Sequence, residues 1–574
     1  MFKPNTLFYA DGYKVGHKAM LAPGTTKLYG TWIPRSIKRA PKGVKKIVSF
    51  GQQLVWRWIH DEFQENFFGQ NEKVAEQFGK DMSAYLGAEY DASHFKALWD
   101  LGYLPIRVKA LPEGIETEPN IAHMTFINTV DGFAWLTLYL ETIVSSLAWK
   151  PATSATSSLQ YRRNLVKWVM KTDPSNAWLI DFLAHDFSAR GLSPWDSLSS
   201  GLGHAVSFKG SDSLIVIPGS RYFYGVGEDE MPIFSVNASE HSVSTTKIFT
   251  VGEKQMLSDW MKIFPKGILS VVSDTFDLWK LITEYLPELK EEIMGRDGKL
   301  VIRPDSGDPV DIICGLEDKV HRFTDEGELQ DFLNYAENYE NEIIEWKGSF
   351  YQIRGVEEFI REYGFENFEP RVSKFHELVD GHKIGILYPV KDPTPVGPQV
   401  KGVIELLWDI FGGTINEQGY KVLDTHIGAI YGDSITLERQ EQIYERLAAK
   451  GFAATNIVLG VGSFTYQYNT RDTLGFAAKG AWFENNGQGI DIYKDPITDD
   501  GTKKSAKGLV AVYEVVEADT TGKLHHKGYM MKDQCDGEEE EGGLLQVIYE
   551  NGKFYNQVTL NEVRERITKL SEHE

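Results

Sequence analysis

Two stretches of this chain share the pattern that decides its fold. Residues 268–274 read Ile268-Leu-Ser-Val-Val-Ser-Asp274, and residues 300–307 read Leu300-Val-Ile-Arg-Pro-Asp-Ser-Gly307. In both, a short run of apolar residues ends in charged or small polar residues, as a buried strand does where it meets a loop. Helical patterns separate such strands along the chain, and strands that alternate with helices indicate a parallel sheet.

Four further segments between residues 177 and 463 repeat this pattern. A single segment of this kind could be no more than a strand and a turn. Six of them, with polar residues gathered at the strand ends, predict a (β/α) barrel whose site lies at the carboxyl ends of the strands. The four additional apolar runs and the polar segments after them are Leu179–Ala184 with His185-Asp-Phe187, His204–Phe208 with Lys209-Gly-Ser-Asp212, Ile427–Ile430 with Tyr431-Gly-Asp433, and Asn456–Leu459 with Gly460-Val-Gly-Ser463.

The first part of the chain has a different, mixed pattern. Gln52–Phe68 carries apolar residues at helical spacing, and Phe133–Leu147 also reads as an apolar helix. Ile106–Ala110 alternates as a strand and is followed by a turn, and His123–Asn128 is its expected partner strand.

The segment from about residue 311 to 400 interrupts the strand–helix rhythm and closes with Pro393-Thr-Pro395 and Gly397-Pro398, a composition typical of a tether. Its aromatic residues, which include Trp346 and Phe350, are too numerous for disorder. Because loops that follow barrel strands lie on the active-site face, we expect a partly helical subdomain that borders the pocket.

Composition excludes several classes of protein. The chain has 574 residues and a formal net charge of −22, which disfavours a nucleic-acid partner. Its two cysteines, Cys314 and Cys535, are too few for a disulfide framework. Neither a signal peptide nor a membrane-spanning run is apparent, so we expect a soluble cytoplasmic protein of two or three domains.

An acidic chain that binds an anionic substrate needs local cations or a metal ion. Arg303, followed by Asp305 and Gly307, suits a phosphorylated sugar, with Arg on the phosphate and Asp on the ribose hydroxyls, although a surface ion pair would look the same. The glycines of 431–433 and 460–463 could cradle a phosphate with backbone N–H groups or only turn the chain. The one clearly basic stretch runs from Lys494 through Lys503, Lys504 and Lys507.

Glu240-His241-Ser242 follows a polar segment. A histidine beside a carboxylate can be an acid–base group or a phosphate acceptor, and it can equally be a hydrogen-bonded structural residue.

Taken together, these motifs resemble those of the nicotinamide phosphoribosyltransferases, a family of type II phosphoribosyltransferases. The resemblance covers residues 8–308 and 400–567, and residues 310–398 are extra. The motifs in matching order are Asp11-Gly-Tyr-Lys-Val-Gly-His17, His185-Asp-Phe187 with Arg190-Gly191, Phe208-Lys-Gly-Ser-Asp212, Glu240-His241-Ser242, Ser270-Val-Val-Ser-Asp274, Ile302-Arg-Pro-Asp-Ser-Gly307, Tyr431-Gly-Asp433, Thr470-Arg-Asp472 and Tyr493-Lys-Asp-Pro496.

The resemblance implies an irregular α/β barrel with an α/β sandwich domain, in a homodimer that shares its active sites. It places the sandwich in residues 1–150 and 486–574, the barrel in 151–309 and 400–485, and an atypical insertion in 310–399. The implied activity transfers the 5-phosphoribosyl group of 5-phosphoribosyl pyrophosphate to nicotinamide, with Mg²⁺ as cofactor and ATP as coupling co-substrate.

The resemblance also implies roles for individual residues. His241, Asp305, Asp212 and Arg303 are the expected catalytic residues, with His241 the phosphate acceptor from ATP and Asp274 a ligand for Mg²⁺. Phe187 and the partner subunit's Tyr13 would stack on the nicotinamide ring, and Asp212 would hold its carboxamide. The remaining substrate-binding residues would be Asp11, Arg190, Ser270, Asp274, Gly432, Asp433, Gly462 and Ser463, and the phosphate-binding residues Arg35, Arg471, Lys479 and Lys494.

Some positions depart from the family pattern. Ser188-Ala189 replaces Gly-Tyr after the stacking Phe187, Gly428 stands where Arg is usual, and Ala477 where Ser is usual. The alternatives are a nicotinate phosphoribosyltransferase and a non-catalytic binding protein on the same fold. Asp212 favours the nicotinamide enzyme over the nicotinate enzyme, because a carboxylate accepts a hydrogen bond from an amide and repels an acid, unless Asp212 only caps a helix.

Overall fold

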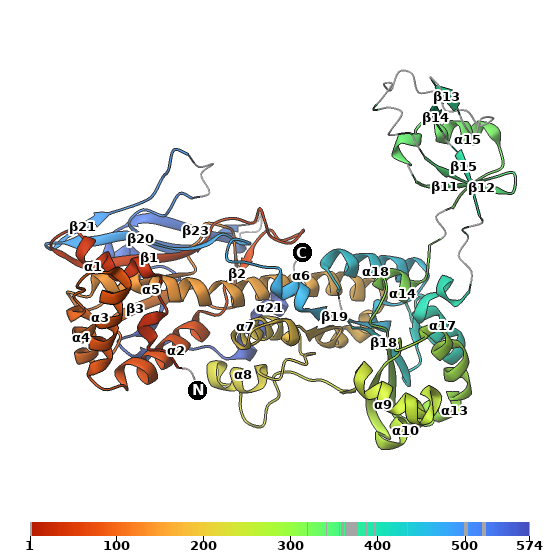
Figure 1. Cartoon of the computed structure of the whole chain (residues 1–574), viewed down its shortest axis with the longest axis horizontal. Coiled ribbons are helices and arrows are strands. Elements are labelled where there is room, and N and C mark those ends of the chain that lie inside the picture. The colour runs from red at the N-terminus through yellow and green to blue at the C-terminus, as the bar shows by residue number, and fades with distance from the viewer. Residues whose placement is uncertain are drawn as a thin grey trace.

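The structure is a computed structural model of the chain (Figure 1). The residues that it describes are 3–317, 320–339, 341–354, 356, 361, 377–379, 382–384, 387–391, 393, 397–432, 434–498, 503–518 and 524–572.

A six-stranded parallel sheet forms one end of the molecule. Its strand order is β6-β19-β18-β9-β8-β7. Two isolated parallel bridges, Asp186 to Ser211 and Gly210 to Phe234, continue the pairing from β6 back to the segment that leads into β7. The sheet therefore closes into an irregular barrel. Its strands are β6 (Ala184–Phe187), β7 (Asn237–Ala238), β8 (Lys266–Val272), β9 (Asp297–Arg303), β18 (Ile427–Tyr431) and β19 (Ile457–Gly462).

The outward faces of these strands are covered by helices. Leu269, Val271, Leu300 and Ile302 pack in one core with apolar residues from the surrounding helices. This explains the alternation of the strands between helix-facing and lumen-facing residues. The covering helices are α6 (Trp149–Thr172), α10 (Glu253–Ile263), α14 (Pro309–Cys314), α17 (Gly402–Phe411) and α18 (Leu437–Ala449).

The predicted barrel is confirmed, with two corrections to its strands. His204–Phe208 is not a strand, because His204 and Ala205 end α7 (Pro194–Ala205) and the pairing residues are Gly210 and Ser211. The apolar run from Leu179 lies mostly in a 3₁₀ helix, Pro174–Phe182, and β6 begins only at Ala184. Both runs are short and mostly apolar, and such a pattern does not distinguish a buried helix from a buried strand.

A mainly antiparallel sheet forms the other end of the molecule, in the order β21-β20-β1-β5-β3-β24-β25. The N-terminal part supplies β1 (Thr25–Pro34), β3 (Ile106–Ala110) and β5 (Met124–Asn128), as predicted for the last two. The C-terminal part supplies the remaining strands, which are β20 (Phe476–Asn485), β21 (Gln488–Asp491), β24 (Gln546–Glu550) and β25 (Lys553–Phe554).

This sheet lies between helices and a long hairpin, which makes it the predicted α/β sandwich. One face packs against α2 (Gln52–Phe63), α3 (Lys73–Leu86), α4 (Ser93–Leu101) and α5 (Ala134–Leu147). On the other face, Tyr29 and Ile33 of β1 pack against Val510 and Val512 of the hairpin β22 (Leu509–Ala518) and β23 (Leu524–Cys535). Figure 1 shows the helices below this sheet and the hairpin above it.

One long helix joins the two ends. The helix α6 runs from the sandwich to the barrel (Figure 1) and buries many small polar residues, including Ser154 and Ser158. Small side chains let α7 approach it closely, since a Cβ added at Gly203 of α7 would lie 2.8 Å from Ser154 Cβ. The C-terminal helix α21 (Leu560–Ser571) and α8 (Val216–Tyr224) join α7 and α6 in a further apolar core.

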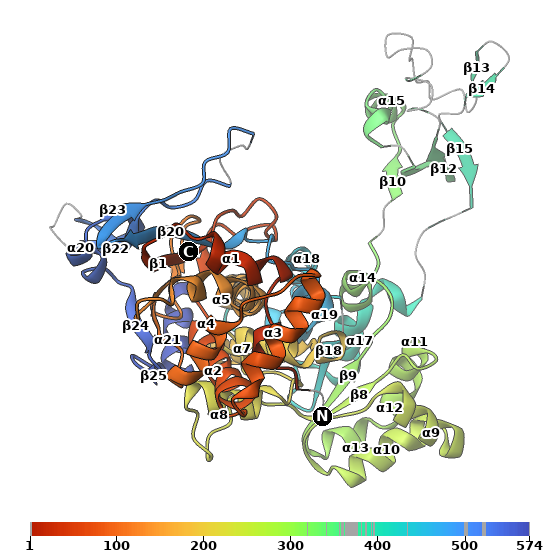
Figure 2. The same cartoon turned by 60° about the vertical axis from the view of Figure 1, so that its left-hand side comes forward.

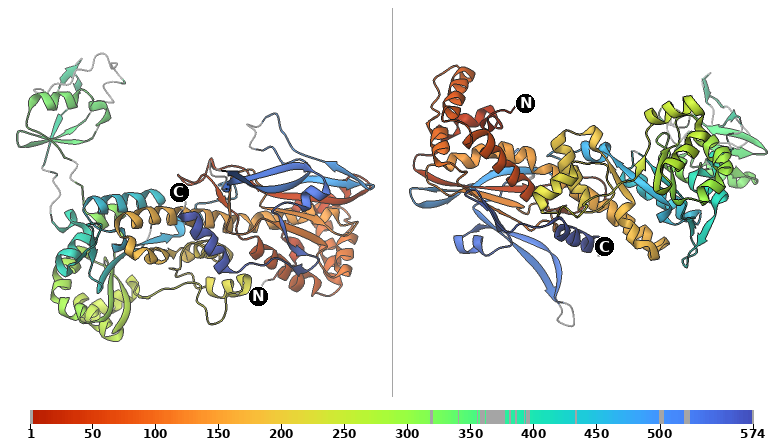
Figure 3. Two further views of the ribbon diagram at one scale, coloured as in Figure 1. Left: turned by 180° about the vertical axis from the view of Figure 1, so that it is seen from behind. Right: turned by 90° about the horizontal axis from the view of Figure 1, so that it is seen from below.

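The described part of the insertion forms a small subdomain with its own apolar core, which includes Leu329, Ile344 and Trp346. Figures 1 and 2 and the left view of Figure 3 show it standing away from the barrel. The expectation that it borders the pocket is therefore wrong. Its elements are β10 (Val320–Phe323), α15 (Glu326–Leu333), β11 (Ile343–Trp346), β12 (Ser349–Ile353), β13 (Glu377–Val379), β14 (His382–Ile384) and β15 (Leu387–Val390).

The two ends of the insertion are fastened to each other and to the barrel. Leu316 N–H donates to Gln399 O at 2.9 Å. Arg446 of α18 pairs with Asp311, and Lys450 donates to the carbonyls of Cys314 and Lys401. The chain therefore leaves the barrel for the subdomain and returns to the barrel at the same place.

Within the described residues, no helix is both long enough and apolar enough to span a membrane.

Candidate active site

The lumen of the barrel is open. A cavity of about 420 Å³ runs through it, reaching from the carboxyl ends of the strands, at Phe187 and Asp212, to their amino ends, at Lys299 and Val458. Barrel interiors are usually filled by large side chains. Here Ala238, Ser270 and Gly428 present small ones to the lumen, which leaves room for a ligand.

Four of the predicted site residues line this cavity: Phe187, Asp212, Ser270 and Arg303. Phe187 ends β6, and a Cβ added at Gly460 of β19 would lie 2.8 Å from its ring. A glycine is therefore required at 460 if the ring is to keep this position. The ring of His185 lies beside it, with 4.6 Å between the two centroids.

Asp212 does not cap a helix, because α8 begins at Val216 and its N-cap residue is Ile215. Its Oδ1 accepts hydrogen bonds from His185 Nε2, at 3.0 Å, and from the Ser235 hydroxyl. Burial opposes ionisation of this carboxyl group. The hydrogen bonds and the nearby charges of His185 and Arg303 outweigh burial, so the pKa of Asp212 is lowered. Asp212 therefore presents a negative charge to the cavity.

Arg303 lies across the lumen at the end of β9. One Nη atom donates to Ser239 O at 2.8 Å, and its buried Nε has no hydrogen-bond partner among the described residues. An unsatisfied buried donor of a guanidinium suits an anionic or carbonyl ligand. Arg190 lies at the rim, where it approaches Glu240 to 3.8 Å.

His241 faces two carboxylates at the mouth of the barrel. Its Nε2 lies 3.7 Å from Asp274 and 3.9 Å from Asp305, and its Nδ1 contacts the Thr275 hydroxyl at 3.1 Å. The imidazole is 46% exposed, so a phosphate donor could reach it.

Asp274 fixes the loop after β9. Its Oδ2 accepts from the Asp305 N–H at 2.9 Å and from the Ser306 hydroxyl at 2.5 Å. Its Oδ1 is buried and has no hydrogen-bond partner among the described residues.

These residues offer a small carboxylate site for a cation. Among the described residues, no cluster of three or more His, Cys, Asp or Glu side chains could hold a metal ion. Mg²⁺ commonly binds through one or two carboxylates and takes its other ligands from water and substrate phosphates. Asp274, with its unpartnered oxygen, and Asp305 fit such a partial site.

The glycine-rich ends of β18 and β19 come close to these carboxylates. A Cβ added at Gly432 would lie 2.2 Å from Asp305 Oδ1, so a side chain at this position would displace the Asp305 carboxylate. Gly462 and Ser463 lie where β19 meets the short helix α19 (Ser463–Gln467). Asp433 lies outside the described residues.

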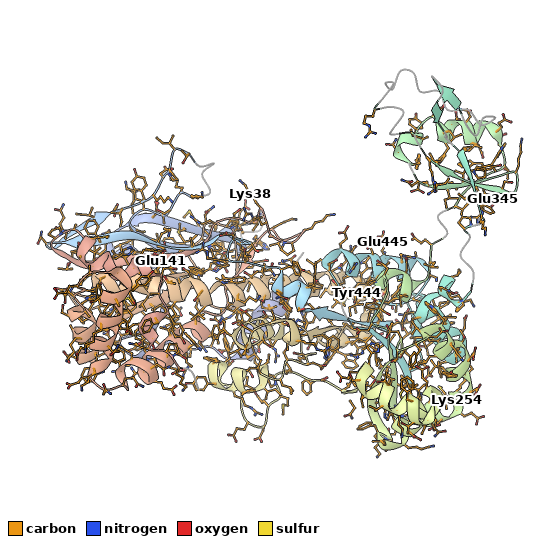
Figure 4. All side chains as sticks on the ribbon, in the orientation of Figure 1. Lys38, Glu141, Lys254, Glu345, Tyr444 and Glu445 are labelled. Atoms are coloured by element: carbon orange, nitrogen blue, oxygen red, sulfur yellow. The ribbon has the colours of Figure 1, made fainter. Side chains whose placement is uncertain are left out.

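The structure separates the other predicted residues from the barrel. Arg35, Lys479 and Lys504 line a pocket of about 250 Å³ between the sandwich sheet and the hairpin. Lys479 pairs with Glu141 of α5 at 2.8 Å, and Glu141 is labelled in Figure 4. Tyr13 is 64% exposed beside this surface, and Asp11 accepts from Thr142 of α5. Arg471 and Lys494 are also exposed, and none of these residues lines the lumen.

Sequence reasoning missed several residues that the structure places at these sites. His185 lies in the motif His185-Asp-Phe187, and its position two residues before Phe187 was the available signal. Lys299 fills the space beside Gly428, since its Cδ lies 3.1 Å from where a Cβ at 428 would be. Burial lowers the pKa of Lys299 against the opposing charge of Asp424. Ser235 carried no distinguishing pattern, and Lys504 was recognised only as a member of the basic stretch.

Comparisons with known proteins place the chain in a family. The chain belongs to the nicotinate phosphoribosyltransferase (NAPRTase) family, whose model matches residues 182–339 and 388–548. Membership makes the chain an enzyme of the pentosyltransferase class. The predicted relationship to the type II phosphoribosyltransferases is thereby confirmed.

The names of individual relatives are more specific than the name of the family. Nicotinamide phosphoribosyltransferase of Acinetobacter baylyi is 36% identical over 100% of this chain and 98% of its own length. The protein of that name from Xanthomonas campestris is 28% identical over 98% of this chain and 97% of its own. Among solved structures, human nicotinic acid phosphoribosyltransferase aligns with 98% of this chain and 93% of its own at 12% identity, with a TM-score of 0.48.

Proposed function

We propose that this enzyme transfers the 5-phosphoribosyl group of 5-phosphoribosyl pyrophosphate to nicotinamide, in the salvage of NAD. The products are nicotinamide mononucleotide and pyrophosphate. The observation that carries the proposal is the ionised carboxylate of Asp212 beside the Phe187 ring in the barrel lumen. The names of the relatives support the same substrate.

Asp212 would select the base. Both hydrogen bonds that reach its carboxylate from described residues end on Oδ1, so Oδ2 is the oxygen that would accept the amide N–H of nicotinamide. Nicotinic acid would instead bring a negative charge against Asp212 in a partly dry cavity. Removing a hydrogen bond and adding repulsion together disfavour the acid by several kcal/mol, on the order of a hundredfold or more.

The remaining residues would position the sugar and stabilise the leaving group. The ring nitrogen of nicotinamide is a weak nucleophile, so the reaction depends on alignment of the base with the sugar carbon. Stacking on Phe187 fixes the plane of the ring. Asp305 is placed to accept hydrogen bonds from the ribose hydroxyls, and Arg303 to stabilise negative charge that develops as pyrophosphate departs.

Mg²⁺ is the cofactor that this arrangement favours. Asp274 and Asp305 are the carboxylates that would hold it, and when bound it would supply positive charge for the pyrophosphate.

ATP coupling would act through His241. Attack of an imidazole nitrogen on the γ-phosphorus of ATP forms an N–P bond and releases ADP, and water later removes the phosphoryl group. The ring attacks in its neutral form, and Asp274 and Asp305, both within 4 Å of Nε2, would stabilise the positive charge that the ring acquires when it is phosphorylated.

The active sites would be completed across a homodimer. Tyr13, Arg35, Arg471 and Lys479 lie on the sandwich and do not line the lumen of their own chain. A two-fold interface would bring the sandwich of one chain to the barrel of the other and create two equal sites.

Product analysis tests the proposal. The enzyme is incubated with 5-phosphoribosyl pyrophosphate, Mg²⁺ and either nicotinamide or nicotinic acid, with and without ATP. We expect nicotinamide mononucleotide as the main product. Formation of the nicotinic acid product alone would identify a nicotinate enzyme, and no product from either base would indicate a binding protein.

A further inference from the structure

The carboxylate of Asp186, between His185 and Phe187, is completely buried, and the described residues offer it no ion-pair partner. Its Oδ1 accepts from the Ser188 N–H at 2.9 Å. Its Oδ2 accepts from the hydroxyl of Ser211 at 3.0 Å and from that of Ser213 at 2.6 Å. A buried carboxylate without a cation is costly, and three donors offset that cost.

The three donors belong to residues directly adjacent in sequence to Phe187 or Asp212. Ser188 follows Phe187, and Ser211 and Ser213 are the two neighbours of Asp212. The backbone of Asp186 joins the same segments, because its N–H donates to Gly210 O at 3.1 Å and its carbonyl accepts from the Asp212 N–H at 2.9 Å. One residue therefore ties the chain that carries the stacking ring to the chain that carries the selecting carboxylate.

The donors around the side chain of Asp186 require a hydrogen-bond acceptor at this position. The Ser211 hydroxyl oxygen already accepts from the Ser213 N–H at 3.1 Å, so its proton is directed to Asp186. A carboxylate only accepts, whereas an asparagine would present an NH₂ group to one side of this ring of donors. His204 and Tyr466 are the nearby titratable groups, and they bond to each other at 2.7 Å.

We propose that Asp186 is a positioning residue that sets the separation of Phe187 and Asp212 and thereby the selectivity between nicotinamide and nicotinic acid. The proposal rests on the proposed function, because it concerns the same base. Asp186 itself does not line the cavity, so its effect would pass through the two residues that it holds.

Asp186→Asn tests this most sharply, since it keeps the shape and replaces one of the two accepting oxygens by a donating NH₂ group. We expect kcat/KM for nicotinamide to fall about tenfold or more, mainly through the KM for the base. The KM for 5-phosphoribosyl pyrophosphate should stay unchanged, and the ratio of kcat/KM for nicotinamide to that for nicotinic acid should shrink. Ser213→Ala and the double variant Ser211→Ala, Ser213→Ala should shift the ratio in the same direction.

Asp173→Asn is the matched control. Asp173 is also a fully buried carboxylate, and it accepts from the side chains of Ser175, Asn176 and Thr455 near the opposite end of the barrel. This variant should lose thermal stability without changing the ratio between the bases.

The outcomes distinguish a failure of the proposed function from a failure of the positioning role of Asp186. Wild-type enzyme that makes no nicotinamide mononucleotide would refute the proposed function. Active wild type with an unchanged ratio in Asp186→Asn would refute only the positioning role, as would an equal loss for both bases. If Asp186→Asn does not fold, the serine variants decide, and an unchanged ratio in both would overturn the proposal.

Discussion

The barrel mouth and the basic surface of the sandwich differ in how firmly they hold their side chains. At the mouth, Asp212 and Asp274 each accept two hydrogen bonds, and the side chain of Asp274 is only 7% exposed. On the sandwich, Tyr13 is mostly exposed and Arg471 contacts only its neighbour Asp472 among the described ion pairs. The comparison indicates that one chain preorganises the proposed base and ribose sites but not the proposed phosphate contacts.

The largest expected effect is at the mouth. Asp305→Ala should lower kcat/KM by about a thousandfold, because it removes the ribose contact and a carboxylate for Mg²⁺ together. Steady-state kinetics with nicotinamide measures this. Asp297→Ala, at the exposed start of the same strand, is the control and should retain activity. Similar losses in both variants would mean that the effect is on folding.

A mixing experiment tests whether the sandwich surface serves the barrel of another chain. Tyr13→Ala and Asp305→Ala should each be poorly active alone. Random heterodimers place both defects in one site and leave the other intact, so mixing should restore about a quarter of wild-type activity. No recovery in heterodimers verified by mass spectrometry would contradict shared sites.

The effect of His241 should be smaller and specific to ATP. His241→Ala should keep basal synthesis and lose the stimulation by ATP, which is expected to be several-fold. The matched control is His426→Ala, because His426 pairs with Asp424 at the amino end of β18. Stimulation of His241→Ala equal to that of the wild type would exclude the phosphohistidine.

The smallest effect is expected from the insertion, which contributes nothing to the described lining of the lumen. Replacing residues 319–396 by a short Gly-Ser linker keeps the bond of Leu316 to Gln399 and the contacts of Arg446 and Lys450. We expect kcat/KM to change by about twofold or less. A tenfold loss in the folded variant would show that the subdomain acts on the site.

Much of the barrel could be predicted because most of its strands, though not β7, have a recognisable local sequence pattern. Ile268–Val272 and Ile427–Ile430 are short apolar runs that end in polar residues, and both lie within strands of the structure. His204–Phe208 has the same local composition, yet His204 belongs to a helix whose neighbours are α6 and α8. Only tertiary packing distinguishes the two cases.

The candidate site was predictable to the extent that its residues stand in motifs. Phe187 and Arg303 end strands and Asp212 follows a bridge residue, and the closure of the barrel brings all three to one cavity. The role of Asp186 depends on hydrogen bonds to serines about 25 residues away, which no local pattern encodes. The position of the insertion likewise depends on where its two ends are fastened, at Leu316 and Gln399.

The choice between the two bases tests the central claim most directly. kcat/KM is measured for nicotinamide and for nicotinic acid with the wild type and with Asp212→Asn. We expect the wild type to prefer nicotinamide on the order of a hundredfold or more, and Asp212→Asn to show a much smaller preference. Equal use of both bases by the wild type, or an unchanged ratio in Asp212→Asn, would contradict it.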